Sequence, residues 1–159
     1  MADMSAADLE NIHTYVQEHF FKLTVGIKDK GLLDSIANRP NQRNYEIIQY
    51  PNIYSKAASI MEAIIRWHPF ADGNKRTALL ATSLYLHING FQLIIPLSAV
   101  RFRVEIALEK ETDPKSNEKL LRRITKWIKQ RSARIDDPDE IRRVYNRRAE
   151  RENTCYCTI

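Results

Sequence analysis

The sequence has few cysteines and no long apolar run, and each absence excludes a class of protein. Its 159 residues include two cysteines, Cys155 and Cys157, close to the end. Two cysteines so placed cannot cross-link a core, so we expect an intracellular, cytoplasmic protein with no metal role for this tail. No apolar run is long enough to span a bilayer, and no secretory signal begins the sequence.

Positive charge is present, but it is confined to one segment. The net charge is +5, and residues 112–132 hold seven Lys or Arg against two acids. The rest of the chain is neutral, which argues against nucleic-acid binding along its length. The segment predicts one basic helix face, which is either a solvated surface or a docking site for an acidic partner. Its residues are Lys119, Arg122, Arg123, Lys126 and Lys129.

Apolar residues recur at helical spacing through most of the chain, and this predicts an all-α fold, a compact helical bundle. The expected helices cover 6–23, a short stretch near 32–36, 54–67, 74–89, 98–110 and 116–131. The helix over 74–89 is apolar nearly all round, which is typical of the centre of a bundle. A short extended piece is expected at 91–95. We expect residues 1–132 to form the helical domain and 133–159 to form a charged C-terminal extension, helical or partly disordered.

One polar segment interrupts this pattern before the helix at 54–67. Residues 38–44 are rich in Asn, Arg and Gln and contain Pro40. Segments of this composition rarely pack into a core, so we expect a surface flap or loop.

The run from His68 to Thr77 combines a base, a carboxylate, a glycine and two cations between two expected helices. The backbone N–H groups of residues 73–76 would lie at a helix N-terminus, which is a ready anion site. Gly73 tolerates positive φ and allows close approach of a ligand.

Each side chain of this run also suits a role in polyphosphate chemistry. Asp72 can hold Mg²⁺, and Arg76 can clamp phosphate oxygens. His68 can accept the proton of an attacking hydroxyl. Phe70 would anchor the loop in the core, and Asn74 could orient phosphate. Taken singly, these residues are more often helix caps or solvated charges. Their combination in order favours a catalytic anion-binding loop.

At these positions the sequence resembles the Fic/Doc family, whose loop has the form His-x-Phe-x-(Asp/Glu)-Gly-Asn-(Gly/Lys)-Arg between two helices of a small bundle. The residues that fit this form are His68, Phe70, Asp72, Gly73, Asn74, Lys75 and Arg76. The resemblance extends from about Gly31 to Gly90. It implies a helical bundle of the Fic/Doc type with a short extended flap before the motif helix.

The resemblance also implies an activity, the transfer of part of a nucleotide to a protein hydroxyl, with ATP as co-substrate and Mg²⁺. By this carry-over His68 is the base, Asp72 holds Mg²⁺, and Asn74 and Arg76 bind phosphate together with Gly73 and Lys75. The flap that aligns the target would be Asn38, Arg39, Pro40, Asn41 and Gln42.

Two branches of the family differ at the position between the Asn and the Arg of the motif. Nucleotidylating members usually have Gly there, whereas Doc-like toxins have Lys and pass the ATP γ-phosphate to a translation factor. Lys75 favours the Doc branch, while Gly73 departs from the Doc toxin, which has Ala at that position. The alternatives are a nucleotidyltransferase that adds AMP or another NMP to Ser, Thr or Tyr, and a binding module with an inactive motif.

Members of the family are often restrained by a glutamate of an inhibitory helix. The self-inhibiting signature places Ser or Thr four residues before a Glu-Gly or Glu-Asn pair. Here Glu10-Asn11 has Ala6 in that place, so the match is incomplete. A separate antitoxin partner is therefore expected, with no membrane association.

Overall fold

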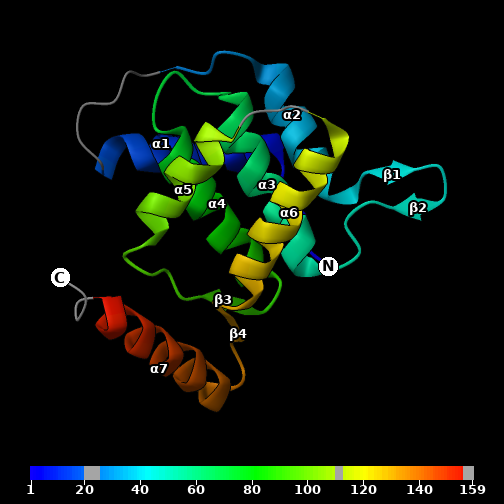
Figure 1. Ribbon diagram of the computed structural model, residues 1–159. Coiled ribbons are helices and arrows are strands. Elements are labelled where there is room, and N and C mark those ends of the chain that lie inside the picture. Colours follow the sequence, from blue (N-terminus) through cyan, green and yellow to red (C-terminus); the bar gives the residue numbers. More distant parts are fainter. Residues whose placement is uncertain (20–25, 110–112, 156–159) are drawn as a thin grey trace.

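Helix α3 lies at the centre of a bundle of helices, and the expected all-α architecture is confirmed (Figure 1). The structure is a computed structural model that describes residues 1–19, 26–109 and 113–155, without the side chains of 148–155. In chain order its elements are α1 (Ala6–His19), α2 (Lys30–Asn38), a 3₁₀ helix η1 (Arg39–Asn41), β1 (Arg43–Asn44), β2 (Ile47–Ile48), α3 (Ile53–Trp67), α4 (Asn74–Ile88), β3 (Phe91–Leu93), α5 (Ala99–Leu108), α6 (Pro114–Lys129), β4 (Ser132–Arg134) and α7 (Pro138–Cys155).

The core forms where α3 packs against α4 and α6. Ten of the fifteen residues of α3 are buried, so this helix is covered on nearly every side. The apolar helix α4 was expected at the centre, but Leu84 and Ile88 on it are exposed. That expectation was wrong because apolar composition does not report which face of a helix its neighbours cover.

Local signals set the ends of several helices. Asn52 caps α3, with its side chain accepting a hydrogen bond from the backbone N–H of Ser55. Gly90 follows α4 with φ of 86°, as expected of a glycine that ends a helix. Asp113 caps α6 and Pro114 occupies its first turn. The expected α1 extended to 23; the structure ends it at His19, and residues 20–23 lie outside the described part.

The polar segment expected to be a surface flap or loop is exposed for most of its length, and Arg39 and Pro40 are the part that packs inward. Asn38 ends α2, residues 39–41 form η1, and Pro40 is buried. The extended flap begins after them, as a hairpin in which β1 pairs antiparallel with β2. It projects from the bundle, and Tyr45 at its turn is 96% exposed (Figure 1). The hairpin pairs the end of a polar stretch with two isoleucines, and the sequence alone does not indicate this pairing.

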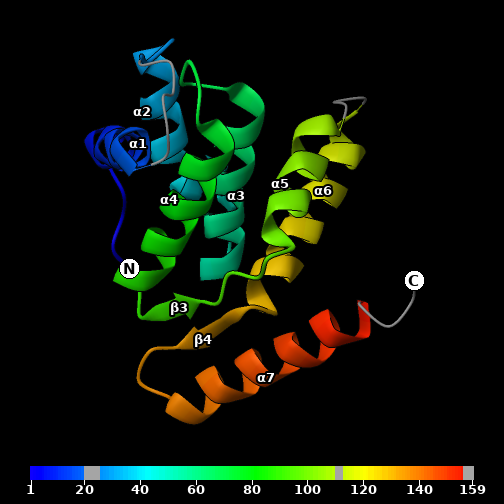
Figure 2. The ribbon, with the colours of Figure 1, turned by 90° about the vertical axis from the view of Figure 1, so that its left-hand side faces the viewer.

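The chain after the bundle is tied to it by a second small sheet. Strand β4 pairs antiparallel with β3, so the expected domain boundary at 132–133 falls inside this strand. Helix α7 follows and lies beneath the bundle, with the two strands between them (Figure 2). Val144 of α7 is buried, whereas most of the helix is polar. Cys157 lies outside the described residues.

Helix α6 presents the basic face expected from the sequence. Lys119, Arg122, Lys126 and Lys129 are exposed, opposite the buried stripe Leu120, Ile124, Trp127 and Ile128. Two ion pairs neutralise part of this face, Arg122 with Glu118 and Arg123 with Glu109. None of the helices in the described ranges is long and apolar enough to cross a membrane.

Candidate active site

An open pocket of about 390 Å³ lies where the motif loop meets α5. Its lining comes from the motif loop, the first turn of α4 and the facing side of α5. The residues are His68, Ala71, Asp72, Gly73, Asn74, Lys75, Arg76, Val100, Arg103 and Val104. The structure therefore brings six of the seven motif residues to one cavity, and the seventh, Phe70, lies behind it in the core.

His68 follows the last residue of α3 and leaves the helix through a left-handed backbone conformation, with φ of 51°. Its Nδ1 lies 3.2 Å from the backbone carbonyl oxygen of Arg66. Because a carbonyl can only accept, this contact favours the tautomer with the hydrogen on Nδ1, in which the neutral ring has its lone pair on Nε2. His68 thus has the tautomer of a general base, and it lines the pocket.

The N-terminus of α4 offers fewer free donors than the sequence suggested. Gly73 precedes the helix with φ of 76°, a left-handed conformation that favours glycine. Its own N–H donates to Asp72 Oδ1 at 2.6 Å, and the Arg76 N–H donates to the Gly73 carbonyl at 3.0 Å. Among the described residues, no acceptor pairs with the N–H groups of Asn74 and Lys75. Two of the four expected donors therefore remain for an anion.

Asn74 braces the loop with its side chain. Its Oδ1 accepts the Phe70 backbone N–H at 3.0 Å, and its Nδ2 donates to the Phe70 carbonyl at 2.8 Å. These two bonds use one of the two Nδ2 hydrogens, so a phosphate contact of the Asn74 side chain stays a prediction. Its backbone N–H is a second group that can contact an anion.

Phe70 is fully buried and stacks on a residue of α1 that the sequence did not single out. Its ring lies 3.8 Å from that of His13, with the planes 13° apart. His13 Nδ1 lies 3.0 Å from the Thr77 hydroxyl of α4. Burial lowers the pKa of His13, and the nearby Asp72 carboxylate opposes this shift. His13 therefore clamps the two ends of the motif loop to α1.

Asp72 is the carboxylate available for a cation. It is exposed, with Oδ1 accepting the Gly73 N–H, and no described donor is paired with Oδ2. In the described ranges, no three His, Cys, Asp or Glu side chains gather into a metal cluster. One carboxylate beside a phosphate pocket fits Mg²⁺, which takes part of its shell from phosphates and water. The residues present therefore fit this ion.

Three cations surround the pocket, and one of them was not expected from the sequence. Lys75 and Arg76 belong to the first turn of α4. Arg103 reaches the pocket from α5, where its Nη1 donates to the Lys75 carbonyl at 2.9 Å. Burial and the charge of Arg76 lower the pKa of Arg103. An arginine 27 positions after Arg76 carries no sequence signal, because only folding places α5 against the loop.

Arg39, expected in the target-aligning flap, is instead part of a buried ion network. It pairs with Glu62 of α3, which also accepts from Arg66 Nη1 at 3.1 Å. The Arg39 guanidinium lies 4.7 Å from the centre of the Trp67 ring. Since the Arg66 carbonyl fixes the tautomer of His68, this network supports the end of α3 that carries the base.

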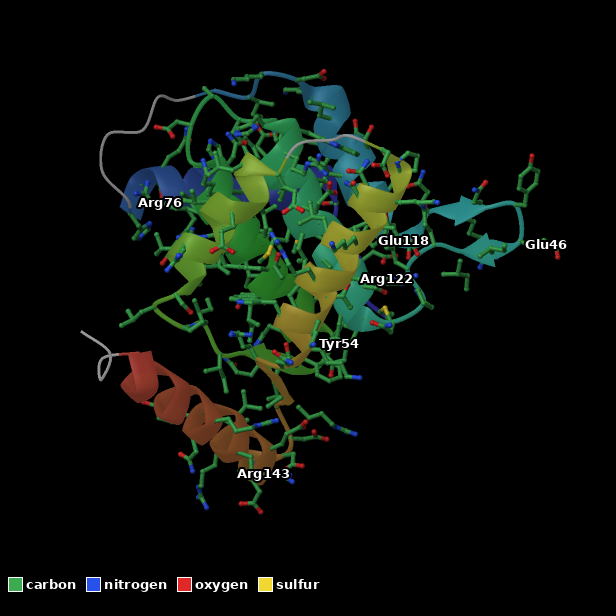
Figure 3. The ribbon with its side chains drawn as sticks, viewed as in Figure 1. Glu46, Tyr54, Arg76, Glu118, Arg122 and Arg143 are labelled. Carbon is green, nitrogen blue, oxygen red and sulfur yellow. The ribbon has the colours of Figure 1, made fainter. Side chains whose placement is uncertain are left out.

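The projecting hairpin and the pocket of the motif loop lie on opposite sides of the bundle. Figure 3 shows Glu46 at the tip of the hairpin and Arg76 at the far side of the molecule. No hairpin residue lines the pocket. A target that touched the hairpin and the pocket together would therefore have to extend across the bundle.

Two comparisons with known proteins agree with this geometry. A sequence model of the Fic/DOC family matches residues 3–86, slightly more than half of the chain. The protein Toxin Doc of Mycolicibacterium smegmatis is 45% identical over 67 residues. That match covers 42% of this chain and 52% of the relative, so the chain spans about half the length of the curated relative it matches.

Proposed function

The chain belongs to the Fic/DOC family, and from that premise we propose that it is a Doc-like toxin of a toxin–antitoxin pair that phosphorylates a protein. It transfers the γ-phosphate of ATP to a hydroxyl of its target, and we expect the target to be a translation factor. The observation that carries the proposal is His68, a base with a free Nε2 in the pocket that also holds Asp72 and Arg76.

In the proposed reaction the target hydroxyl attacks the γ-phosphorus and gives its proton to His68 Nε2. A bond forms between the hydroxyl oxygen and phosphorus, and the bond from phosphorus to the β,γ-bridging oxygen breaks, so that ADP leaves. Arg76 and the backbone N–H groups of Asn74 and Lys75 bind the phosphate oxygens. Asp72 would hold Mg²⁺, which neutralises charge on the phosphates when bound.

A labelling experiment tests this activity. We expect γ-labelled ATP with Mg²⁺ to label a protein in a cell lysate when the chain is added. His68→Ala should abolish labelling while the protein stays folded, because the base is lost. His87→Ala is the matched control, since His87 is exposed in the last turn of α4 and should be dispensable. Equal labelling by folded His68→Ala would refute the role of the base.

Gly73 favours a second candidate, a nucleotidyltransferase that modifies Ser, Thr or Tyr with AMP or another NMP. Gly73 has a left-handed φ, which glycine adopts easily and which strains alanine. The Doc toxin has alanine at this position. In that reaction the α-phosphorus is attacked and pyrophosphate leaves. Transfer of label from α-labelled ATP would favour this candidate.

A further inference from the structure

Arg103 is held at the pocket by two backbone carbonyls. Its Nη1 donates to the Lys75 carbonyl at 2.9 Å, and its Nε donates to the Ala99 carbonyl at 3.2 Å within α5. These bonds fix the plane of the guanidinium group beside the start of α4. The side chain is half-buried, and it lines the pocket together with His68 and Asp72.

The guanidinium of Arg103 has no carboxylate partner among the described residues, unlike several neighbouring arginines. Arg101, two residues earlier, pairs with Glu105, and Arg123 pairs with Glu109. A half-buried cation without a counter-ion is costly unless an anion occupies the space that it faces. Two further basic residues, Lys75 and Arg76, and one acid, Asp72, line the same pocket, so its balance of charged residues is positive and suits a polyphosphate.

We propose that Arg103 is a substrate-binding residue of α5 that contacts a distal phosphate group of the nucleotide, beside the first turn of α4. Arg76 and the α4 N-terminus bind the polyphosphate from one side, and Arg103 binds it from α5. The pocket then holds a chain of phosphates between two helices, so its affinity for a nucleotide rises with phosphate number. This inference rests on the proposed function, because it names a further ligand of the same co-substrate.

A tethering role is the alternative, in which Arg103 only joins α5 to α4 through the Lys75 carbonyl. The two roles differ in what they do to short nucleotides. Loss of a tether disturbs the loop and weakens every nucleotide alike. Loss of a phosphate ligand weakens ATP strongly and leaves AMP almost unchanged, since AMP lacks the distal phosphates.

The test measures calorimetric affinities for ATP, ADP and AMP with Mg²⁺, using the full chain. Arg103→Gln keeps a donor near the place of Nε, which bonds the Ala99 carbonyl, but it removes the charge and the Nη1 bond to the Lys75 carbonyl, so the comparison of ATP with AMP separates the two roles. Arg103→Lys keeps the charge. Arg101→Ala is the control on the same helix, because the Arg101 side chain is 87% exposed and lies outside the pocket.

We expect Arg103→Gln to bind ATP about tenfold or more weakly, as for the loss of a charge-assisted hydrogen bond, with AMP affinity nearly unchanged. Arg103→Lys should recover part of the loss, and Arg101→Ala should match the unmodified protein. Equal weakening of ATP and AMP, or no weakening, would overturn the proposal. If the unmodified protein binds no nucleotide and labels no target, the proposed function itself fails.

Discussion

Glu62→Gln should strongly destabilise the fold, because Glu62 is the acid that neutralises two largely buried arginines. Its side chain is 4% exposed, and those of Arg39 and Arg66 are 12% and 7% exposed. Glutamine keeps the shape but removes the negative charge that Arg39 and Arg66 share in a poorly solvated place. Breaking a buried ion pair from one side costs about 3–5 kcal/mol. We expect the lower end, because the amide oxygen still accepts one hydrogen bond.

Urea denaturation measures this cost. With an m-value of about 2 kcal/mol/M, a loss of about 3 kcal/mol lowers the midpoint by about 1.5 M. Glu118→Gln is the matched control, since Glu118 pairs with Arg122 on the exposed face of α6 and both side chains are more than 60% exposed (Figure 3). Exposed pairs contribute about 0–1 kcal/mol. If Glu62→Gln shifts the midpoint no more than Glu118→Gln does, Glu62 does not hold the network.

Three further predictions concern the motif loop. Asn74→Ala should lower the free energy of unfolding by about 2–4 kcal/mol in thermal or urea denaturation, because it leaves the N–H and carbonyl of buried Phe70 unpaired. The pKa of His13 is lowered in the folded protein, so its neutral form contributes stability that is complete above the unfolded pKa of 6.5 and is lost as pH falls through the folded pKa. His13→Gln should therefore flatten the fall of the urea midpoint below pH 6.5. An unchanged slope of midpoint against pH would contradict this. Asp72→Ala should remove the Mg²⁺ dependence of ATP binding in calorimetry, and an unaltered Mg²⁺ dependence would exclude Asp72 as the ligand.

The bundle was largely predictable from the sequence because its helices carry strong local signals. The helix expected at 54–67 is α3, which begins one residue earlier, and that expected at 74–89 is α4, which ends one residue earlier. Apolar spacing and the caps at Asn52, Gly90 and Asp113 are local features. Contacts between helices are not local, and for this reason the central position was assigned to α4 and not to α3.

The inward packing of two residues of the expected flap was not predictable, because composition does not report tertiary partners. Arg39 and Pro40 look like loop residues in the sequence, but Glu62, two turns into α3, offers Arg39 a buried partner. The hairpin that follows has no Gly at its turn, and Tyr45 adopts positive φ instead. A turn of that kind lacks the residues by which hairpins are usually found.

The motif loop was found because its residues are contiguous, whereas its supports come from elsewhere in the chain. His13 arrives from α1 and Arg103 from α5, each as a single residue in an amphipathic helix. One histidine or arginine on a helix carries no signal of the pocket that it will meet. The bracing of Phe70 by Asn74 was missed for the same reason, since an asparagine amide suits phosphate or backbone equally well.

The most direct test of the central claim compares ATP labelled separately at the α- and γ-positions, with Mg²⁺ and the same lysate. The proposed phosphotransferase moves label to protein from γ-labelled ATP and not from α-labelled ATP. Lys75→Gly should lower that transfer, because it removes a charge and opens space at the start of α4. Label that reaches protein from α-labelled ATP with the unmodified chain would contradict the account and establish nucleotidyl transfer in its place.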